Sequence, residues 1–377
     1  LSPPTPLKNC KCRKIRGIIM LKTEVLSAIN VSDAEYKRII EKAAETVKRG
    51  SVAALPTETV YGLFANALSG EAVRKIFDAK GRPQDNPLIV HIADFEDVYK
   101  LSDDVPIEAK LLAEKFWPGP FTMILKSNGK VAKEVSAGLS TVAIRMPDSK
   151  IALDVIRESK LPLAAPSANI SGFPSPTSAE HVIDDMTGRI ELIIDGGDCR
   201  FGVESTVLSL TGDVPKILRP GAVTAEDIKS VVGAVEIDES VLKPLAEDAK
   251  VSSPGMKYRH YSPKAQVIVL KGSFKEYLDY INNERKDGDF ALCFDGEEDK
   301  LPINAVSYGA ENDSLAQAQR LYGALRQLDD MGAKRVFARC PSKEGVGLAV
   351  CNRLFRAAGF NVVDLEKALQ AGFLWQR

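Results

Sequence analysis

The sequence predicts an α/β protein with two domains, and three observations support this fold class. Short apolar runs typical of buried strands alternate with segments whose apolar residues recur at helical spacing. The chain has 377 residues, which exceeds the size at which a single hydrophobic core stops growing. The alternation fades over residues 242–264 and then resumes. We therefore expect a catalytic domain over residues 24–241, a linker over 242–264 and a second domain over 265–377.

In the first domain, the expected helices and strands are short and irregularly ordered. One helix begins at Ser32, with Glu35 completing a capping box, and ends at Gly50. Another ends at Gly81, and further helices are expected over 106–117, 150–160 and 178–188. Strands are expected over 51–55, 87–92, 121–127, 142–147, 161–167, 190–195, 205–212 and 215–221. This order predicts a mixed sheet with flanking helices, because it lacks a strict βαβ repeat.

After the linker, strands and helices alternate regularly. Strands are expected over 266–270, 289–294, 335–340 and 361–365, and helices over 274–285, 314–331 and 346–358. Such alternation predicts a small Rossmann-like domain with a parallel sheet.

Composition excludes several kinds of protein. The net charge of -1 gives no overall attraction to nucleic acid or acidic membranes, so any anion site must be a local cluster. Cys10 and Cys12 are close together, but no second pair completes a zinc site. Cys293, Cys340 and Cys351 lie in apolar segments and are expected to be core thiols of a cytoplasmic protein. No apolar run reaches the ~18–20 residues that span a membrane.

Residues 1–23 lack the pattern of a folded core. Prolines and then basic residues precede Met20, and only a Gly-Ile-Ile run interrupts the polar residues. A signal peptide would need about 7–15 apolar residues there. We interpret this segment as a disordered or leader extension, with Met20 as an alternative start; a basic arm that contacts RNA is the other interpretation.

Two polar clusters follow predicted strands. In "PTETVYGL", Thr57 and Thr59 lie two residues apart, so both hydroxyls can point to one side; a simple turn is the alternative. In "APSANISGFPSPTS", small hydroxyls and glycine would let a phosphate approach backbone N–H groups. Part of that second cluster is also explained as the cap of the next helix.

Four basic residues point to a shared anionic ligand. In "AKGRPQDNPLIVHI", Arg82 offers a planar fork for phosphate oxygens and Lys80 adds a point charge. The alternative for Lys80 is a contact with the carboxyl end of its own helix. Arg145 and Arg219 each end an apolar strand. One such arginine usually forms a structural ion pair, but two together with Lys80 and Arg82 indicate an anion site.

Taken in order, these motifs resemble the threonylcarbamoyl-AMP synthase family of the two-domain type. The matching pieces are "PTETVYGL", "AKGRPQDNPLIVHI", "WPGPFT", "AIRMP", "APSANISG", "ESTV", "LRPG", the linker "SPGMKYRHYSP" and, in the second domain, "GVGLAVCNRLFRAA". The resemblance covers roughly residues 24–370. It implies a YrdC-like twisted mixed sheet in the first domain.

The resemblance also implies an activity, that of a nucleotidyltransferase (adenylyltransferase). L-Threonine, bicarbonate and ATP, with Mg²⁺ on the phosphates, would give L-threonylcarbamoyl-AMP and pyrophosphate. A downstream transferase complex would then modify adenosine 37 of tRNAs that read ANN codons. No metal ligated directly by the protein is expected. The alternative is a YrdC-type module that binds double-stranded RNA or tRNA, which the near-neutral charge disfavours.

Residue roles follow from the resemblance motif by motif. Those implied to hold threonine are Thr59, His91, Arg145, which would pair with its carboxylate, and Ser205. Those implied to bind ATP are Arg82, Asn86, Thr141, Ser167, Ser175 and Arg219. Those implied to act at the phosphates and the reacting centre are Lys80, Arg82 and Asn169. The linker residues expected to form a lid that keeps water from the adenylate are Tyr258, His260 and Tyr261.

Overall fold

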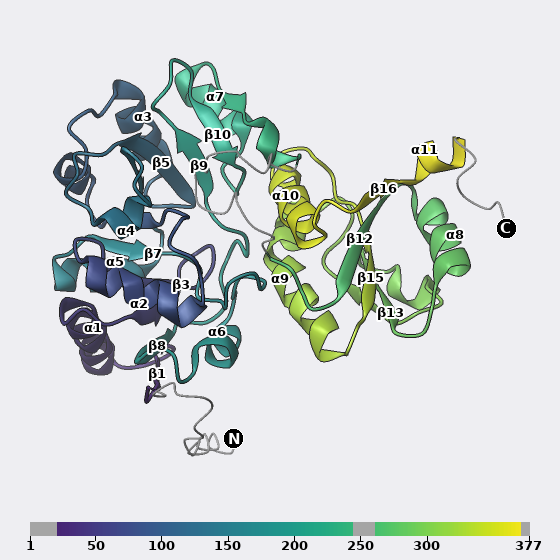
Figure 1. Cartoon of the computed structure of the whole chain (residues 1–377), viewed down its shortest axis with the longest axis horizontal. Helices are drawn as coiled ribbons and strands as arrows, with labels where there is room; N and C mark the ends of the chain where they lie inside the picture. The colour runs from purple at the N-terminus through teal and green to yellow at the C-terminus, as the bar shows by residue number, and fades with distance from the viewer. Residues whose placement is uncertain (1–20, 244–260, 371–377) are drawn as a thin grey trace.

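The computed structural model of the chain describes residues 21–243 and 261–370, which form two lobes (Figure 1). The first lobe begins with strand β1 at Glu24, and the C-terminal lobe begins with strand β12 at Gln266. Both lobes combine helices with a sheet, so the predicted α/β class is confirmed. Helices α9 (Ser314–Asp330) and α10 (Gly347–Ala357) of the C-terminal lobe lie at the junction with the first lobe.

The first lobe is built on a mixed sheet of eleven strands in the order β1-β8-β2-β3-β7-β4-β6-β5-β9-β10-β11. The sheet contains parallel pairs such as β4 with β6 and antiparallel pairs such as β5 with β6. The strands are β1 (Glu24–Ser27), β2 (Ala53–Leu55), β3 (Gly62–Asn66), β4 (Ile89–His91), β5 (Phe121–Lys126), β6 (Thr141–Arg145), β7 (Leu163–Ala165), β8 (Leu192–Asp195), β9 (Thr206–Ser209), β10 (Lys216–Arg219) and β11 (Glu236–Ile237).

Helices cover both faces of this sheet. They are α1 (Asp33–Lys48), α2 (Gly70–Lys80), η1 (Phe95–Lys100), α3 (Ile107–Phe116), α4 (Lys133–Ser136), α5 (Lys150–Ser159), α6 (Ala179–Met186), α7 (Ala225–Val232) and η2 (Glu239–Val241). Helices α1 and α5 bury their apolar residues in one core, and α2, α3, α6 and α7 bury theirs in another. Because each amphipathic helix buries one side, the sheet is enclosed between two apolar layers.

The start of α1 corrects one detail of the prediction. Ser32 Oγ accepts a hydrogen bond from the backbone N–H of Glu35 at 3.3 Å, as an N-cap does. The Glu35 carboxylate, however, pairs with Arg38 at 2.6 Å instead of reaching back to the cap. The prediction that Glu35 completes a capping box is therefore wrong. The guanidinium of Arg38, one turn further along the exposed face of the helix, is the better partner for the Glu35 carboxylate.

The sequence reasoning also missed several short elements, including β3 and, in the C-terminal lobe, β14 (Ala305–Ser307). Strand β3 has five residues and β14 has three. Such strands are fixed by pairing with distant neighbours, β3 with β2 and β7, and β14 with β13. Local periodicity carries little information about them.

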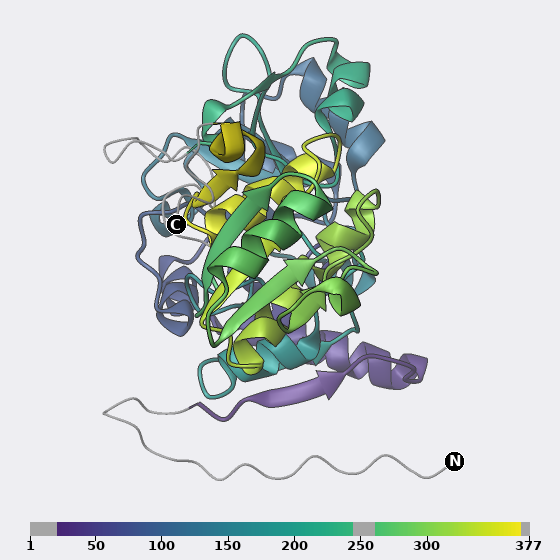
Figure 2. The ribbon, with the colours of Figure 1, turned by 90° about the vertical axis from the view of Figure 1, so that its right-hand side faces the viewer.

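The C-terminal lobe contains a five-stranded sheet in the order β14-β13-β15-β12-β16, and every pair is parallel, as predicted. Besides β14, its elements are β12 (Gln266–Lys271), α8 (Phe274–Glu284), β13 (Asp289–Cys293), η3 (Glu298–Lys300), α9 (Ser314–Asp330), β15 (Arg335–Arg339), α10 (Gly347–Ala357), β16 (Val362–Asp364) and α11 (Leu365–Gln370). Figure 2 views this lobe from its outer side, with the first lobe behind it.

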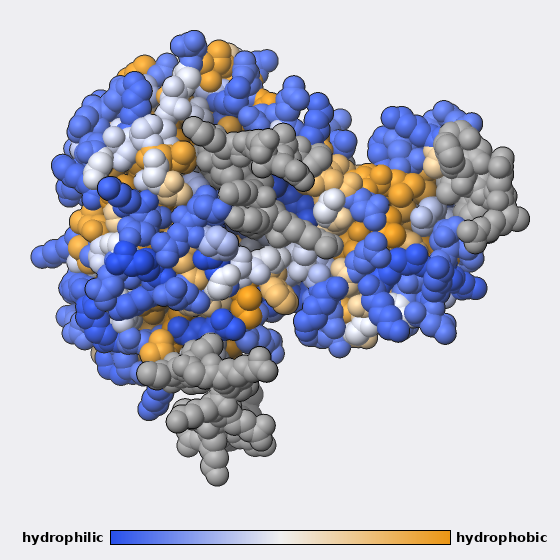
Figure 3. All heavy atoms as spheres, in the orientation of Figure 1, coloured by the Kyte–Doolittle hydropathy of each residue, from blue (hydrophilic) through white to orange (hydrophobic). Residues whose placement is uncertain are grey.

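Two apolar clusters fill the C-terminal lobe. Residues of α9 and α10 pack on one face of its sheet, and residues of α8 and α11 pack on the other. Cys293 and Cys351 are buried, as expected of core thiols, whereas Cys340 is half-buried. Seen as in Figure 3, the surface is largely hydrophilic on this side, with apolar residues visible on both lobes, including a group on the C-terminal lobe. Within residues 21–243 and 261–370, no helix combines the length and apolarity needed to cross a membrane.

Candidate active site

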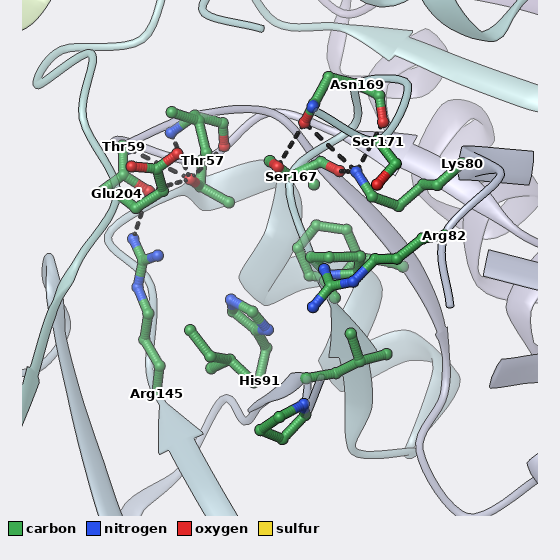
Figure 4. A pocket seen from close by; sticks show the side chains of 18 of the residues that line it. Thr57, Thr59, Lys80, Arg82, His91, Arg145, Ser167, Asn169, Ser171 and Glu204 are labelled. Atoms are coloured by element: carbon green, nitrogen blue, oxygen red, sulfur yellow. Dashed lines mark hydrogen bonds between the residues drawn. The ribbon is translucent and has the colours of Figure 1, made fainter. Parts of the chain in front are cut away.

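A pocket of about 770 Å³, counting the space open to solvent, lies in the first lobe beside β4, β6 and β7. Figure 4 shows Arg82, His91 and Arg145 pointing from different elements toward one open space. The sequence-predicted residues that line the pocket are Thr59, Lys80, Arg82, His91, Arg145, Ser167, Asn169, Arg219 and Tyr261. The fold thus gathers four basic residues from three separate motifs into one cavity, as an anion site requires.

Arg145 ends strand β6 and is held by three contacts. Its Nη2 donates to Glu58 Oε1 at 2.7 Å and to Thr59 Oγ1 at 3.0 Å, and its Nε donates to the Gly119 carbonyl at 3.3 Å. The side chains of Arg145 and Glu58 are 5% and 2% exposed, so this ion pair is buried. The contacts fix the plane of the guanidinium at the wall of the pocket, where it can recognise a planar anion such as a carboxylate.

His91 lies next to Arg145 on the parallel neighbour strand β4. Its ring packs against Phe64, with the ring centroids 5.0 Å apart. Burial, with a smaller effect from the nearby Arg145, lowers the pKa of His91 to about 3, so the imidazole is neutral at physiological pH. Its buried Nδ1 has no hydrogen-bond partner among the described residues. A buried polar atom without a partner at a pocket wall is suited to a ligand.

This neutral histidine predicts a pH dependence of stability. Because the pKa of His91 is about 3 in the folded protein and near 6.5 in the unfolded chain, the unfolded chain binds more protons in that interval. The free energy of unfolding should therefore fall with pH below 6.5, by about 2 kcal/mol down to pH 5 from this residue. Urea unfolding at pH 7 and pH 5 should show a smaller loss in His91→Asn, which does not titrate. Equal losses in both proteins would contradict the buried neutral state.

Lys80, in the last turn of α2, fastens the loop after β7. Its Nζ donates to the carbonyl of Ser167 at 2.5 Å, to the carbonyl of Asn169 at 2.6 Å and to Asn169 Oδ1 at 3.3 Å. The residue is 2% exposed, and burial together with Arg82 lowers the pKa of Lys80. Three oxygen acceptors nevertheless match the three N–H donors of an ammonium group. The contacts run to another segment, which disfavours the interpretation that Lys80 serves its own helix end.

The loop after β7 is rigidly organised around Asn169. Ser167 Oγ donates to Asn169 Oδ1 at 2.5 Å, and Asn169 Nδ2 donates to the carbonyls of Ile170 and Phe173, both at 2.8 Å. The backbone N–H of Ser171 donates to the Lys80 carbonyl at 2.9 Å. These bonds fix the backbone of this loop along one side of the pocket before any ligand arrives.

Four of the predicted site residues do not line this pocket. Asn86 is fully buried, and its carbonyl accepts from Arg82 Nη2 at 3.2 Å. Thr141 lines a smaller neighbouring pocket that shares Pro87 and Leu88 with the first. Ser175 and Ser205 are buried just behind the wall, where Ser175 contacts Glu204 and Ser205 contacts Arg219. None of these four residues is among those that line the first pocket in this structure.

Two carboxylates near the site were missed in the sequence. Glu58 lies between the two noted threonines and pairs with Arg145. Glu204, next to Ser205, lines the pocket and pairs with Arg353 of the C-terminal lobe at 2.8 Å. The sequence did indicate that such carboxylates exist, because an arginine in an apolar strand or helix needs a buried partner of opposite charge.

The predicted lid is described only in part. Tyr258 and His260 lie outside the described residues. Tyr261 is 6% exposed, lines the pocket and packs on Tyr322 of α9, with the ring centroids 5.3 Å apart. Its ring thus lies at the boundary between the pocket and the C-terminal lobe.

Comparison with known proteins accounts for both lobes. Residues 45–221 match the family profile of Sua5, YciO and YrdC, whose description is telomere recombination. Residues 223–359 match the profile described as the C-terminal domain of threonylcarbamoyl-AMP synthase. The threonylcarbamoyl-AMP synthase of Pyrococcus abyssi is 46% identical over 344 residues, which cover 89% of this chain and 99% of that protein. The chain belongs to the threonylcarbamoyl-AMP synthase family.

Other members of the family agree in sequence and in structure. The threonylcarbamoyl-AMP synthase of Bacillus subtilis is 46% identical over 86% of this chain and 94% of its own length. The crystal structure of Pyrococcus abyssi Sua5 complexed with L-threonine superposes with a TM-score of 0.84 at 43% identity, covering 91% of this chain and 99% of that one. Both lobes therefore belong to the two-domain architecture of threonylcarbamoyl-AMP synthases.

Proposed function

We propose that this chain is an L-threonylcarbamoyl-AMP synthase, which joins L-threonine, bicarbonate and ATP and releases pyrophosphate. The observation that carries the proposal is the match over 99% of the length of a synthase with both domains. The pocket supports it chemically, because three arginines and a lysine surround a neutral histidine.

The reaction consists of two bond-forming steps. The neutral amine of threonine attacks the carbon of CO₂ derived from bicarbonate and loses a proton, which gives a carbamate. A carbamate oxygen then attacks the α-phosphorus of ATP, and the bond to the bridging oxygen breaks to release pyrophosphate. Negative charge is present on the carbamate before it attacks, and it develops on the leaving pyrophosphate as the carbamate oxygen bonds to phosphorus. Fixed cations and N–H groups around both sites would stabilise that charge without a covalent enzyme intermediate.

On the threonine side, Arg145 would pair with the carboxylate and Thr59 would lie beside it. His91 Nδ1 would form a hydrogen bond with the substrate, because it is buried at the wall and lacks a partner among the described residues. As a neutral group, His91 can bind there without adding charge next to the amine that must react.

On the ATP side, Arg82 and Arg219 would bind the phosphates, with Lys80 and Asn169 near the reacting centre and Ser167 on the adjoining loop. Asn86, Thr141 and Ser175 remain assigned to ATP by resemblance, although they lie behind the wall or in the neighbouring pocket. Direct contact by these three would require the wall to rearrange when ATP binds.

Magnesium would enter with ATP, bound to its phosphates. The donor set near the pocket fits this arrangement, because Glu58 is paired with Arg145 and Glu204 with Arg353. Among the described residues, no group of three or more histidine, cysteine or acidic side chains could hold a metal ion. The metal would supply charge neutralisation at the leaving phosphates, and the protein would supply their orientation.

The product is a reactive mixed anhydride, so a cytoplasmic transferase that modifies tRNA would be its consumer, as the family resemblance implies. RNA binding as the primary role has less support, since the net charge of the chain is -1.

The direct test is to measure pyrophosphate release from ATP with each amino acid, with and without bicarbonate. We expect release that requires both L-threonine and bicarbonate, with L-threonylcarbamoyl-AMP detected by mass spectrometry. Serine serves as the matched control, because it lacks only the methyl group and should react less efficiently. Release that is independent of threonine or bicarbonate would refute the proposal.

A further inference from the structure

Helix α10 of the C-terminal lobe carries a fully buried arginine into the junction between the lobes. Arg353 is 0% exposed. Its Nε donates to Glu204 Oε2 at 2.8 Å, its Nη1 donates to the Pro220 carbonyl at 2.7 Å, and its Nη2 donates to the Glu204 carbonyl at 3.2 Å. One guanidinium therefore joins α10 to two segments of the first lobe.

Both of those segments border predicted site residues. Glu204 immediately precedes Ser205, the residue before β9, and Pro220 immediately follows Arg219 at the end of β10. Strands β9 and β10 pair antiparallel, so these two ends lie together. Arg219 in turn donates from Nε to the Ser205 carbonyl and from Nη2 to Ser205 Oγ, both at 3.1 Å. Arg353 thus holds the backbone next to Ser205 and next to Arg219.

The Glu204 carboxylate extends the same arrangement to a third predicted residue. It lines the pocket and accepts a hydrogen bond from Ser175 Oγ at 2.6 Å. The hydroxyl of Tyr322, from α9 of the C-terminal lobe, donates to Glu204 Oε2 at 3.0 Å. Although burial alone would raise it, Arg353 and Arg219 lower the pKa of Glu204 to about 2. The carboxylate is ionised, and the C-terminal lobe supplies two of the donors that such a buried charge needs.

We propose that Arg353 is a positioning residue for the ATP side of the pocket. It acts through Glu204 and Pro220, which set the places of Ser175 and Arg219, and it is absent from the residues that line the pocket. The inference rests on the proposed function, because the ATP roles of Ser175 and Arg219 do. It gives the C-terminal lobe a definite part in the reaction beyond supporting the linker.

The geometry requires arginine at this position. Three N–H groups in one plane reach a carboxylate oxygen and two backbone carbonyls at once. A lysine carries the same charge on a single nitrogen, so it can pair with Glu204 but cannot hold the Pro220 carbonyl in the same way. Replacing Arg353 with lysine should therefore impair the site less than replacing it with glutamine.

The test compares Arg353→Gln and Arg353→Lys with the wild type in the full chain. The KM for ATP is measured by pyrophosphate release at saturating threonine, and the Kd for threonine by calorimetry. We expect Arg353→Gln to raise the KM for ATP about tenfold or more, since small displacements of positioned groups have large kinetic effects. Because Ser205, next to Glu204, is implied to hold threonine, the Kd for threonine should also rise, but clearly less than the KM for ATP. The bonds that hold Arg145 and Thr59 involve neither Glu204 nor Pro220. Arg353→Lys should be intermediate.

A matched control separates positioning from loss of stability. Arg335 on β15 forms an ion pair with Asp289 on β13 at 2.5 Å, inside the C-terminal lobe and away from the pocket. Arg335→Gln should lower the Tm but leave the KM for ATP unchanged. In a double-mutant cycle, Arg353→Gln should add little to the KM effect of Glu204→Gln, because both act through one contact.

The outcomes are distinct. An unchanged KM for ATP in Arg353→Gln, or equal rises in the KM for ATP and the Kd for threonine, overturns the inference and leaves the proposed function intact. A wild-type protein that forms no adenylate refutes the proposed function and the inference with it. If Arg353→Gln does not fold, Arg353→Lys decides by the same measurements: an unchanged KM for ATP overturns the inference and a selective rise supports it.

Discussion

Replacing Arg145 with lysine should raise the KM for threonine by about a hundredfold, the equivalent of losing about 3 kcal/mol of binding. Bonds to Glu58, Thr59 and the Gly119 carbonyl hold the guanidinium in one plane. A lysine would keep the charge but could not retain this geometry and also offer a fork to the substrate carboxylate. Initial rates over a range of threonine concentrations, with calorimetry in the absence of ATP, would measure the effect.

The competing explanation is that Arg145 exists to neutralise Glu58. Removing either partner alone leaves a buried charge unpaired, which costs about 3–5 kcal/mol of stability. The double variant Glu58→Gln/Arg145→Gln removes both charges, so it should recover much of the stability lost in Arg145→Gln. We expect it still to bind threonine poorly. Wild-type affinity in the double variant would show that the role assigned to Arg145 is wrong.

Replacing Lys80 with methionine should lower kcat by about 10²–10³-fold, the usual size of effect when one fixed group that stabilises developing charge is removed, because its charge and the loop that it holds both lie at the pocket. Methionine fills the buried space of the lysine stem but lacks its charge and its bonds to the Ser167 and Asn169 carbonyls. The loop after β7 should loosen as well, so thermal unfolding should begin at a lower temperature. Rates should be measured well below the Tm of the variant, so that the folded fraction does not limit activity.

Lys75 provides the control for this substitution. It lies on the same helix, its side chain is 45% exposed, and its Nζ donates to the Gly50 carbonyl at 2.9 Å. Lys75→Met should leave kcat within about twofold of the wild type, since exposed substitutions rarely change more than local contacts. A Lys80→Met variant with kcat within tenfold of the wild type would contradict a role at the reacting centre and leave Lys80 as a loop anchor.

Much of the fold was accessible from local patterns. Helix α2 ends where Gly81 takes a left-handed conformation, with φ of 61°, because glycine adopts it without steric cost. The regular alternation after residue 265 correctly predicted a parallel sheet, since parallel strands need a crossover between them. The half-formed capping box at Ser32 shows the limit of such rules, because Arg38 competes for the same carboxylate.

The residues of the candidate site likewise include some that the sequence placed correctly in the pocket and some that it did not. Arg82 and Arg145 could be selected from the sequence because each stands out within an apolar or rigid local context, and His91 follows from the family resemblance. All three line the pocket. Ser205 and Ser175 carried equally good motifs but lie behind the wall. Which side of a wall a residue faces depends on the twist and pairing of distant strands, and motif spacing does not encode it.

The sequence by itself therefore determined the class of each lobe, the family resemblance and the basic residues of the pocket, because these depend on neighbours within a few positions. Only the tertiary structure decided the charge partners, Glu58 for Arg145 and Glu204 for Arg353, which lie 87 and 149 positions away in the chain. A buried charge needs an opposite charge nearby, but the sequence does not specify which of its acidic residues is the partner. Packing within the first lobe selects Glu58 for Arg145. Packing of the two lobes selects Glu204 for Arg353, and so links the C-terminal lobe to the candidate active site.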